Sequence, residues 1–146
     1  MALQVGDKAP MFSGTTQTGD VISLATFRGK KLALYFYPKD NTPGCTKQAC
    51  NLRDHEAALQ AAGYHIVGIS NDSVASHQRF ATKYNLAFPL IADQDKEITK
   101  AYGTQRMLWF PRRTTFIIDE EGYITHIFKK VDTKAHAQQI LKISAP

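Results

Sequence analysis

The two cysteines of the chain, Cys45 and Cys50, are the residues whose type and spacing could carry chemistry. Cys45 follows Thr42-Pro43-Gly44, a turn that comes after an apolar, aromatic-rich run and before a stretch with helical spacing. Proline suits the first turn of a helix, where its missing N–H would have no partner. A thiol at such a helix start faces free N–H groups and the positive end of the helix dipole, and both favour the thiolate. Because the thiolate is the nucleophilic form, this position predicts a reactive thiol rather than a small core side chain.

The composition indicates an ordinary soluble globular protein with a single domain over residues 1–146. No apolar run approaches the roughly 18 residues that a membrane-spanning helix needs. The net charge is +5 and the pI is about 9.3, but Lys and Arg are scattered and no zinc-finger, RNP-like or basic-zipper pattern is present. We therefore expect solvated surface charge that could steer acidic partners or anions, and no nucleic-acid partner. The start of the chain lacks the basic and apolar segments of a secretory signal, so we expect a cytoplasmic protein.

Two closely spaced cysteines in a cytosolic protein favour redox or metal chemistry over a structural disulfide. Metal is the weaker interpretation, because zinc sites usually need four suitably spaced ligands and the five histidines do not cluster in that way. His55 and Glu56 could form an acid–base pair, but we interpret them as half-exposed helix residues. We place the other histidines near element ends or on polar faces: His65, His77, His126 and His136.

Strands and helices are expected to alternate around Cys45. The predicted strands cover Asp20–Arg28, Lys31–Tyr37, His65–Ser70, Phe88–Ala92, Arg113–Asp119 and Tyr123–Lys130. The predicted helices cover Pro43–Ala62, a segment from Asp72 or Ser73 to Tyr84, Asp95–Tyr102, and a final segment that begins at Thr133. This order predicts an α/β protein with a central mixed β-sheet flanked by helices, and it is compatible with a thioredoxin-like fold.

A longer motif surrounds the cysteine pair. The pattern Pro38-x-x-x-Thr42-x-x-Cys45 resembles the active-site signature of peroxiredoxins, and the Thr-Pro-Gly-Cys-Thr string with Ala49-Cys50 is similar to the peroxiredoxin Q group, also called bacterioferritin comigratory protein. The segments VGDKAPMF and TTFIIDEEGYI extend the resemblance over nearly the whole chain. The resemblance implies a thioredoxin-like fold with an N-terminal peroxiredoxin-type extension. It also implies a thiol-dependent peroxidase for hydrogen peroxide and organic hydroperoxides that requires no metal or organic cofactor.

The resemblance assigns roles to individual residues. Cys45 is expected to be the peroxidatic cysteine, whose sulfur attacks the peroxide. The Thr42 hydroxyl would hold the thiolate and the peroxide, and Pro38 would shield the thiolate and shape the pocket. Arg113 matches the family's arginine before a Thr-Phe strand and would stabilise the thiolate and polarise the peroxide oxygens. Its neighbour Arg112 is the rival, and because adjacent strand residues point to opposite faces, only one of the two can serve.

Cys50 is implied as the resolving cysteine, which would form an intramolecular disulfide with Cys45. In an intact α-helix, Cα atoms five residues apart are separated by roughly 8.5 Å and their side chains diverge by about 140°. A disulfide needs Cα atoms within about 7 Å. Either oxidation unwinds the helix from about Gly44 to Leu52, or Cys50 is a buried apolar residue without a redox role.

The disulfide would need an outside dithiol, and the resemblance implies thioredoxin, with a glutaredoxin as the alternative. An intramolecular resolving cysteine needs no dimer, so we expect a monomer. Two other functions remain open: a thioredoxin-like thiol–disulfide oxidoreductase, which the CxxxxC spacing disfavours against CxxC, and a basic redox-sensing binding protein. The aromatic segment Trp109-Phe110 either lines the substrate mouth or covers the core.

Overall fold

The structure, a computed structural model, describes residues 2–106 and 110–144. Within these residues, seven strands form one mixed sheet in the order β2-β1-β5-β4-β3-β6-β7. The strands are β1 (Ser13–Thr16), β2 (Val21–Ser23), β3 (Lys31–Phe36), β4 (Tyr64–Ser70), β5 (Leu90–Ala92), β6 (Thr114–Ile118) and β7 (Ile124–Phe128). The helices are α1 (Pro43–Asp54), α2 (Glu56–Ala61), α3 (Val74–Tyr84), α4 (Glu97–Ala101) and α5 (His136–Leu141), with 3-10 turns η1 (Leu24–Phe27) and η2 (Lys142–Ser144).

Strand β3 lies at the centre of this sheet and leads into the cysteine-bearing helix. It pairs in parallel with β4 and antiparallel with β6. Its side chains alternate between two cores: Ala33 and Tyr35 face one, and Leu32, Leu34 and Phe36 face the other. An apolar run with both faces buried is typical of a central strand, and the predicted strand at Lys31–Tyr37 is confirmed.

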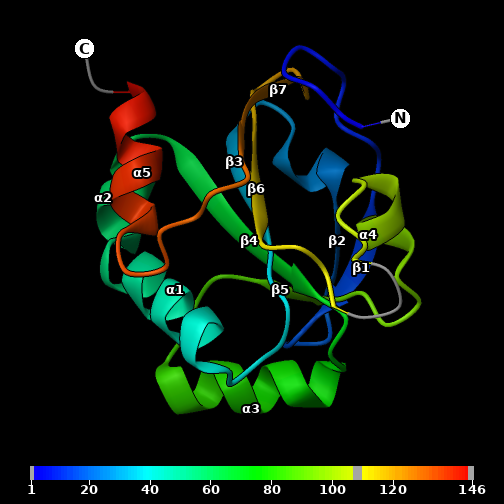
Figure 1. Cartoon of the computed structure of the whole chain (residues 1–146), viewed down its shortest axis with the longest axis vertical. Coiled ribbons are helices and arrows are strands. Elements are labelled where there is room, and N and C mark those ends of the chain that lie inside the picture. Colours follow the sequence, from blue (N-terminus) through cyan, green and yellow to red (C-terminus); the bar gives the residue numbers. More distant parts are fainter. Residues whose placement is uncertain (1, 107–109, 145–146) are drawn as a thin grey trace.

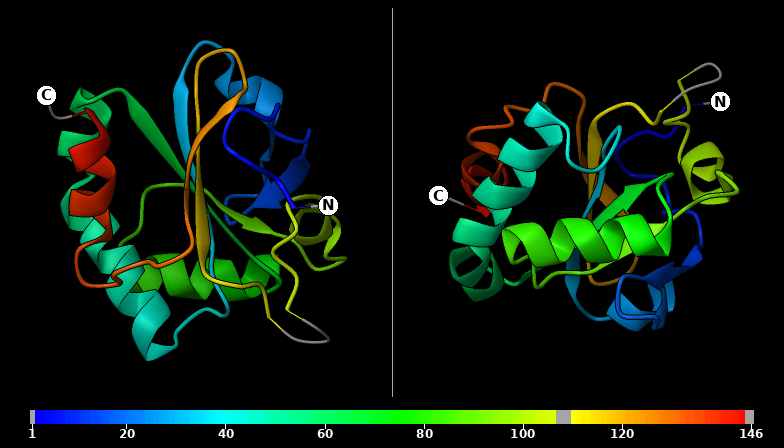
Figure 2. Two further views of the ribbon diagram at one scale, coloured as in Figure 1. Left: turned by 45° about the horizontal axis from the view of Figure 1, so that its top comes forward. Right: turned by 90° about the horizontal axis from the view of Figure 1, so that it is seen from below.

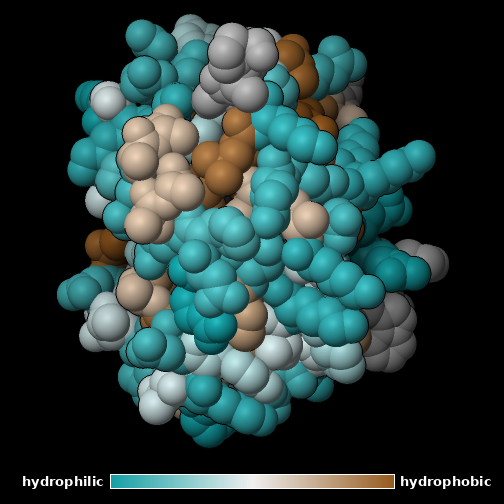
Figure 3. Space-filling view, turned by 90° about the vertical axis from the view of Figure 1, so that its left-hand side faces the viewer, coloured by the Kyte–Doolittle hydropathy of each residue, from teal (hydrophilic) through white to brown (hydrophobic). Residues whose placement is uncertain are grey.

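Helices cover both faces of the sheet (Figures 1 and 2). Helices α1, α2, α3 and α5 contribute to the first core, through residues such as Leu52, Leu59, Phe80 and Ile140. The N-terminal segment, η1 and α4 contribute to the second. The outer side of α2 and α5 presents a mostly hydrophilic surface (Figure 3). Among the described residues, none of the helices has the length and apolar character to cross a bilayer. The predicted mixed sheet flanked by helices is confirmed.

The strand predicted at Asp20–Arg28 is wrong beyond its first residues. Only Val21–Ser23 is strand, and Leu24–Phe27 is a 3-10 turn. The Ser23 N–H donates to Thr26 Oγ1 at 3.0 Å, so a local side chain provides a partner that a sheet would otherwise supply. By contrast, the hairpin predicted at Glu120-Glu121-Gly122 is confirmed by the antiparallel pairing of β6 with β7.

The helix predicted at Pro43–Ala62 is two helices with a break at His55. The backbone of His55 departs from helical angles (φ −111°, ψ 14°), and its Nδ1 lies 2.9 Å from the Asn51 carbonyl oxygen. The last helix begins at His136 rather than at Thr133. Its N-terminal N–H at Ala137 donates to the Asn51 side chain at 2.7 Å, a tertiary contact that local sequence cannot reveal.

Candidate active site

Cys45 lies in the first turn of α1. Residues 37–42, which lead into this helix, form a segment that we call the active-site loop. Thr42 is the N-cap with an extended backbone, and the first helical hydrogen bond runs from Thr46 N to Thr42 O at 2.8 Å. The N–H groups of Gly44 and Cys45 precede this bond, so they form the positive end of the helix dipole. The Cys45 residue is only 2% exposed. The predicted placement of the thiol at a helix start is confirmed.

A guanidinium group from the far end of the chain contacts this thiol. Arg113 Nη2 donates to Cys45 Sγ at 3.3 Å, and Nη1 donates to Gln48 Oε1 at 2.6 Å. The register that pairs Phe36 with Thr114 brings the start of β6 next to the end of β3, where the active-site loop begins. A cation fixed at this position stabilises negative charge on the sulfur.

The neighbouring arginine, Arg112, is exposed, and its backbone N–H donates to the Thr104 carbonyl at 2.7 Å. The structure thus brings Arg113, the arginine that the family resemblance indicated, and not Arg112 into hydrogen-bond contact with the cysteine.

Gly44 allows the guanidinium to approach the helix start closely. A Cβ atom at Gly44 would lie 3.1 Å from Arg113 Nη2, tighter than nearly all real contacts of this kind. The Thr-Pro-Gly turn therefore positions Cys45, and its glycine leaves room for the Arg113 guanidinium.

Thr42 and Pro38 both lie on the active-site loop and are half-buried. The Thr42 hydroxyl donates to the Lys39 carbonyl at 2.8 Å. Because a hydroxyl has one proton and two lone pairs, this bond orients the oxygen and leaves it free to accept a further hydrogen bond.

Cys50 lies on the same unbroken helix as Cys45, is half-buried, and is a free thiol like its partner. Arg53, one turn further along, donates to Asp54 and to the Tyr84 carbonyl. Its hydrogen bonds and charge interactions, first with Asp54 and more weakly with Cys50, raise the pKa of Arg53 above its ordinary value. The guanidinium thus remains a cation beside the second thiol.

Two buried polar atoms near Cys45 have no hydrogen-bond partner among the described residues: Tyr35 Oη and Gln48 Nε2. Burial, with a smaller contribution from Cys45, raises the pKa of Tyr35 well above its ordinary value. Both groups therefore remain neutral donors. Gln48 is a residue to which the sequence assigned no role, although its position one helical turn after Cys45 was the available signal.

The prediction is wrong for His77, which is fully buried on α3 rather than on a polar face. His136 lies at an element end as predicted, since it is the first residue of α5, but it is fully buried too. Each has polar partners inside the protein. His55 and Glu56 are half-exposed, as predicted. Of the aromatic segment Trp109-Phe110, Trp109 lies outside the described residues. Phe110 is exposed, with Lys39 Nζ 5.8 Å from its ring centre.

The comparisons with known proteins agree with this geometry. The model of the AhpC/TSA family matches residues 5–127. The putative peroxiredoxin bcp of Coxiella burnetii is 45% identical, with 97% of this chain and 98% of that protein covered. The chloroplastic peroxiredoxin Q of Triticum aestivum is 40% identical over 94% of this chain, which spans 65% of that plant protein. The crystal structure of peroxidoxin BcpB from Mycobacterium tuberculosis superposes with a TM-score of 0.90 at 32% identity, covering 96% of this chain and 95% of that one.

These matches extend over nearly the whole chain and include the cysteine-bearing loop and helix. The predicted thioredoxin-like fold and the predicted peroxidase activity are both confirmed by them. The chain belongs to the AhpC/TSA family and is a thiol peroxidase of the Bcp/PrxQ group of peroxiredoxins.

Proposed function

We propose that Cys45 is the peroxidatic cysteine of this enzyme. The observation that carries the proposal is the Arg113 guanidinium 3.3 Å from the sulfur at a helix N-terminus. The thiolate attacks one peroxide oxygen, the O–O bond breaks, and the departing oxygen takes a proton to leave as water or an alcohol. Cys45 becomes a sulfenic acid, which is two electrons more oxidised than the thiol.

Arg113 and Thr42 act on the peroxide itself. Charge develops on the departing oxygen, and a donor already fixed in place stabilises that charge without reorganisation. The guanidinium, which Gln48 holds at 2.6 Å, is such a donor. The Thr42 oxygen, oriented by its bond to Lys39, accepts a hydrogen bond from the protonated peroxide oxygen. Pro38 lies on the same loop and limits the access of water to the thiolate.

Cys50 resolves the sulfenic acid. Its thiolate attacks the Cys45 sulfur, a disulfide forms, and the sulfenic oxygen leaves as water. Since both cysteines lie on one intact helix with Cα atoms roughly 8.5 Å apart, the first turns of α1 must unwind for this step.

The hydrogen bonds of Asn51 set the far boundary of this unwinding. Its amide donates to Lys134 O at 3.0 Å and to Gln138 Oε1 at 3.2 Å, and its Oδ1 accepts from Ala137 N at 2.7 Å. These bonds connect the residue after Cys50 to α5. Among the described residues, the segment from Pro43 to Cys50 has no hydrogen bond to α5, so we place the end of unwinding before Asn51 rather than at the expected Leu52.

An external dithiol completes the cycle by reducing the disulfide and becoming oxidised itself. Thioredoxin is the proposed reductant, with a glutaredoxin as the alternative. Because the resolving thiol belongs to the same chain, turnover requires no second copy, and a monomer suffices. A cytoplasmic location fits this cycle, since a reducing compartment maintains the dithiol pool.

Intact-mass analysis after one equivalent of hydrogen peroxide tests these assignments. We expect wild type to lose two hydrogens as the disulfide forms, and Cys50→Ser to bind dimedone at the Cys45 sulfenic acid. Cys45→Ser should keep its mass. Dimedone on Cys50 of the Cys45→Ser variant would reassign the peroxidatic cysteine.

A further inference from the structure

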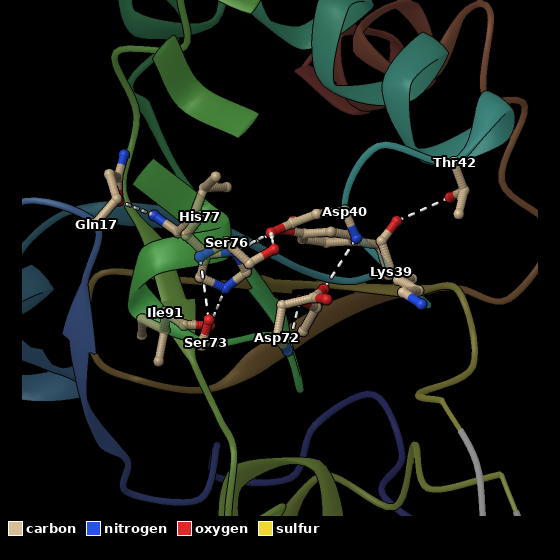
Figure 4. A network of polar contacts seen from close by, with 12 residues as sticks. Gln17, Lys39, Asp40, Thr42, Asp72, Ser73, Ser76, His77 and Ile91 are labelled. Atoms are coloured by element: carbon tan, nitrogen blue, oxygen red, sulfur yellow. Dashed lines mark hydrogen bonds and ion pairs between the residues drawn. The ribbon is translucent and has the colours of Figure 1, made fainter. Parts of the chain in front are cut away.

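A buried ion pair lies between the active-site loop and α3 (Figure 4). Asp40, in the loop, and His77, on α3, face each other with Nδ1 2.7 Å from Oδ2, and their side chains are 4% and 0% exposed. Asp40 also accepts hydrogen bonds from the Tyr37 hydroxyl at 2.6 Å and from the Ser76 hydroxyl at 2.8 Å. The loop carboxylate is thus held by one donor from the loop itself, Tyr37, and by Ser76 and His77 of α3.

The partners of His77 determine where its protons lie. Nε2 is 3.0 Å from the Ile91 carbonyl oxygen, which can only accept, so Nε2 is protonated. A second proton must lie between Nδ1 and Asp40 Oδ2, because two facing lone pairs at 2.7 Å would repel. Burial keeps the pKa of Tyr37 well above its ordinary value, so Tyr37 is a neutral donor to Asp40. The donors around the carboxylate favour an imidazolium–carboxylate pair, which is net neutral.

One peptide unit connects this pair to Thr42. The Asp40 N–H donates to Asp72 Oδ2 at 2.9 Å, and the Lys39 carbonyl of the same peptide accepts from the Thr42 hydroxyl at 2.8 Å. The peptide is planar, with its N–H and C=O on opposite sides. Fixing Asp40 at both its side chain and its N–H therefore fixes the direction of the carbonyl that orients the Thr42 hydroxyl.

A cavity of about 310 Å³ borders this part of the loop, lined by residues that include Lys39, Asp40, Asp72 and Phe80. Asn41, between Asp40 and Thr42, has a left-handed backbone with φ 61°, a conformation that asparagine adopts more readily than most other side chains. The hydrogen bonds of the Asp40 side chain and of its N–H hold the loop next to this turn.

We propose that Asp40 and His77 are positioning residues that orient the Thr42 hydroxyl toward the peroxide. The proposal rests on the proposed roles of Cys45 and Thr42. Neither residue of the pair touches the substrate. They act through the peptide between Lys39 and Asp40.

The test compares two reactions of Cys45, in a Cys50→Ser background so that only one thiol reacts. Peroxide reduction needs the Thr42 hydroxyl, whereas alkylation by iodoacetamide needs only an accessible thiolate. We expect Asp40→Asn and His77→Gln each to lower the peroxide rate constant about tenfold and to change the alkylation rate less than twofold. If the two act as one unit, the double variant should lose little more than either single variant.

Asp93→Asn is the matched control for stability. Asp93 is also a buried carboxylate with three donors, but those donors are Ile98 N, Thr99 N and Thr99 Oγ1, in α4. We expect it to destabilise the fold and to leave the ratio of peroxide rate to alkylation rate unchanged. If Asp40→Asn does not fold, Ser76→Ala removes one donor to the carboxylate and should lower the ratio about threefold.

The Thr42→Val variant shows whether a negative result contradicts the proposed role of Thr42 or only the positioning role of Asp40 and His77. If Thr42→Val leaves the ratio unchanged, the proposed role of Thr42 fails, and this inference fails with it. If Thr42→Val lowers the ratio but Asp40→Asn and His77→Gln do not, only the positioning role is overturned. Asp40, Asp72 and His77 are also close enough to share a metal ion. A shift of the melting temperature on adding Zn²⁺ that Asp40→Asn abolishes would overturn the proposal in favour of a metal site.

Discussion

The Arg113 guanidinium lies 3.3 Å from the Cys45 sulfur, although 68 residues separate the two along the chain. The antiparallel pairing of β3 with β6 brings them together, since the strand that precedes the active-site loop ends beside the strand that follows Arg113. The same guanidinium donates to Gln48 at 2.6 Å, so two residues of α1 fix its orientation.

Removing this guanidinium tests its proposed role. We expect Arg113→Gln to lower the rate constant for hydrogen peroxide by about 10²–10³-fold, the usual cost of losing one preorganised donor. Stopped-flow kinetics at low salt provides the measurement. Arg112→Gln is the matched control, because Arg112 is exposed and it is Arg113 that contacts the sulfur, so this variant should react at the wild-type rate. If the rate constant fell equally in the two variants, the effect would come from general surface charge and not from the contact of Arg113 with the sulfur.

We expect Gly44→Ala to lower the peroxidase activity without lowering the stability of the fold. Alanine is favoured over glycine in helices by up to about 1 kcal/mol, so we expect no loss of stability. The added methyl would lie 3.1 Å from Arg113 Nη2 and must displace it by a few tenths of an ångström. We expect the peroxide rate constant to fall about tenfold at an unchanged denaturation midpoint. A variant with wild-type kinetics would show that the position of the guanidinium is not critical.

Asn51→Ala should make the unwinding of α1 easier. The variant loses the hydrogen bonds to Lys134, Gln138 and Ala137, at a cost of about 1–2 kcal/mol in the free energy of unfolding. We expect conversion of the Cys45 sulfenic acid to the disulfide to accelerate about threefold or more, with less overoxidation at high peroxide. Acid quenching followed by mass spectrometry measures both.

Gln138→Ala is the control for this variant, because it removes only one of the three partners of Asn51. Its effect should be smaller than that of Asn51→Ala. An unchanged rate of disulfide formation in Asn51→Ala would contradict a boundary of unwinding at this residue.

His136 should make the stability of the protein depend on pH. Burial, with a smaller contribution from Arg113, lowers the pKa of His136 below its ordinary value of 6.5. The unfolded chain therefore binds a proton at this residue more readily than the folded one does. The contribution of neutral His136 is fully present above about pH 6.5 and is lost as the pH falls through its lower folded-state pKa. We expect the free energy of unfolding in urea to fall more steeply from pH 8 to pH 5 in wild type than in His136→Gln. The same pH dependence in both proteins would contradict this prediction.

The elements that could be predicted from the sequence are those whose structure depends on residues close together along the chain. The central strand was recognisable because apolar residues occupy both of its faces, and the helix start at Cys45 was recognisable from the Thr-Pro-Gly turn. The choice of Arg113 over Arg112 followed from the resemblance to the family's arginine before a Thr-Phe strand, and not from any local pattern.

The errors involve contacts that are far apart along the chain or specific to one side chain. His77 has helical spacing to Phe80 and Ala81, both buried, so its burial could have been predicted from its helix face. Its partner Asp40 lies 37 residues away, and no local pattern reveals that pairing. The turn at Leu24–Phe27 likewise depends on a single hydrogen bond to Thr26.

The most direct test of Cys45 as the peroxidatic residue is stopped-flow mixing of the reduced enzyme with hydrogen peroxide, without added reductant. We expect wild type and Cys50→Ser each to consume one equivalent of peroxide per chain in a rapid burst. Cys45→Ser should show no burst. A burst of normal size and rate in Cys45→Ser would contradict the account.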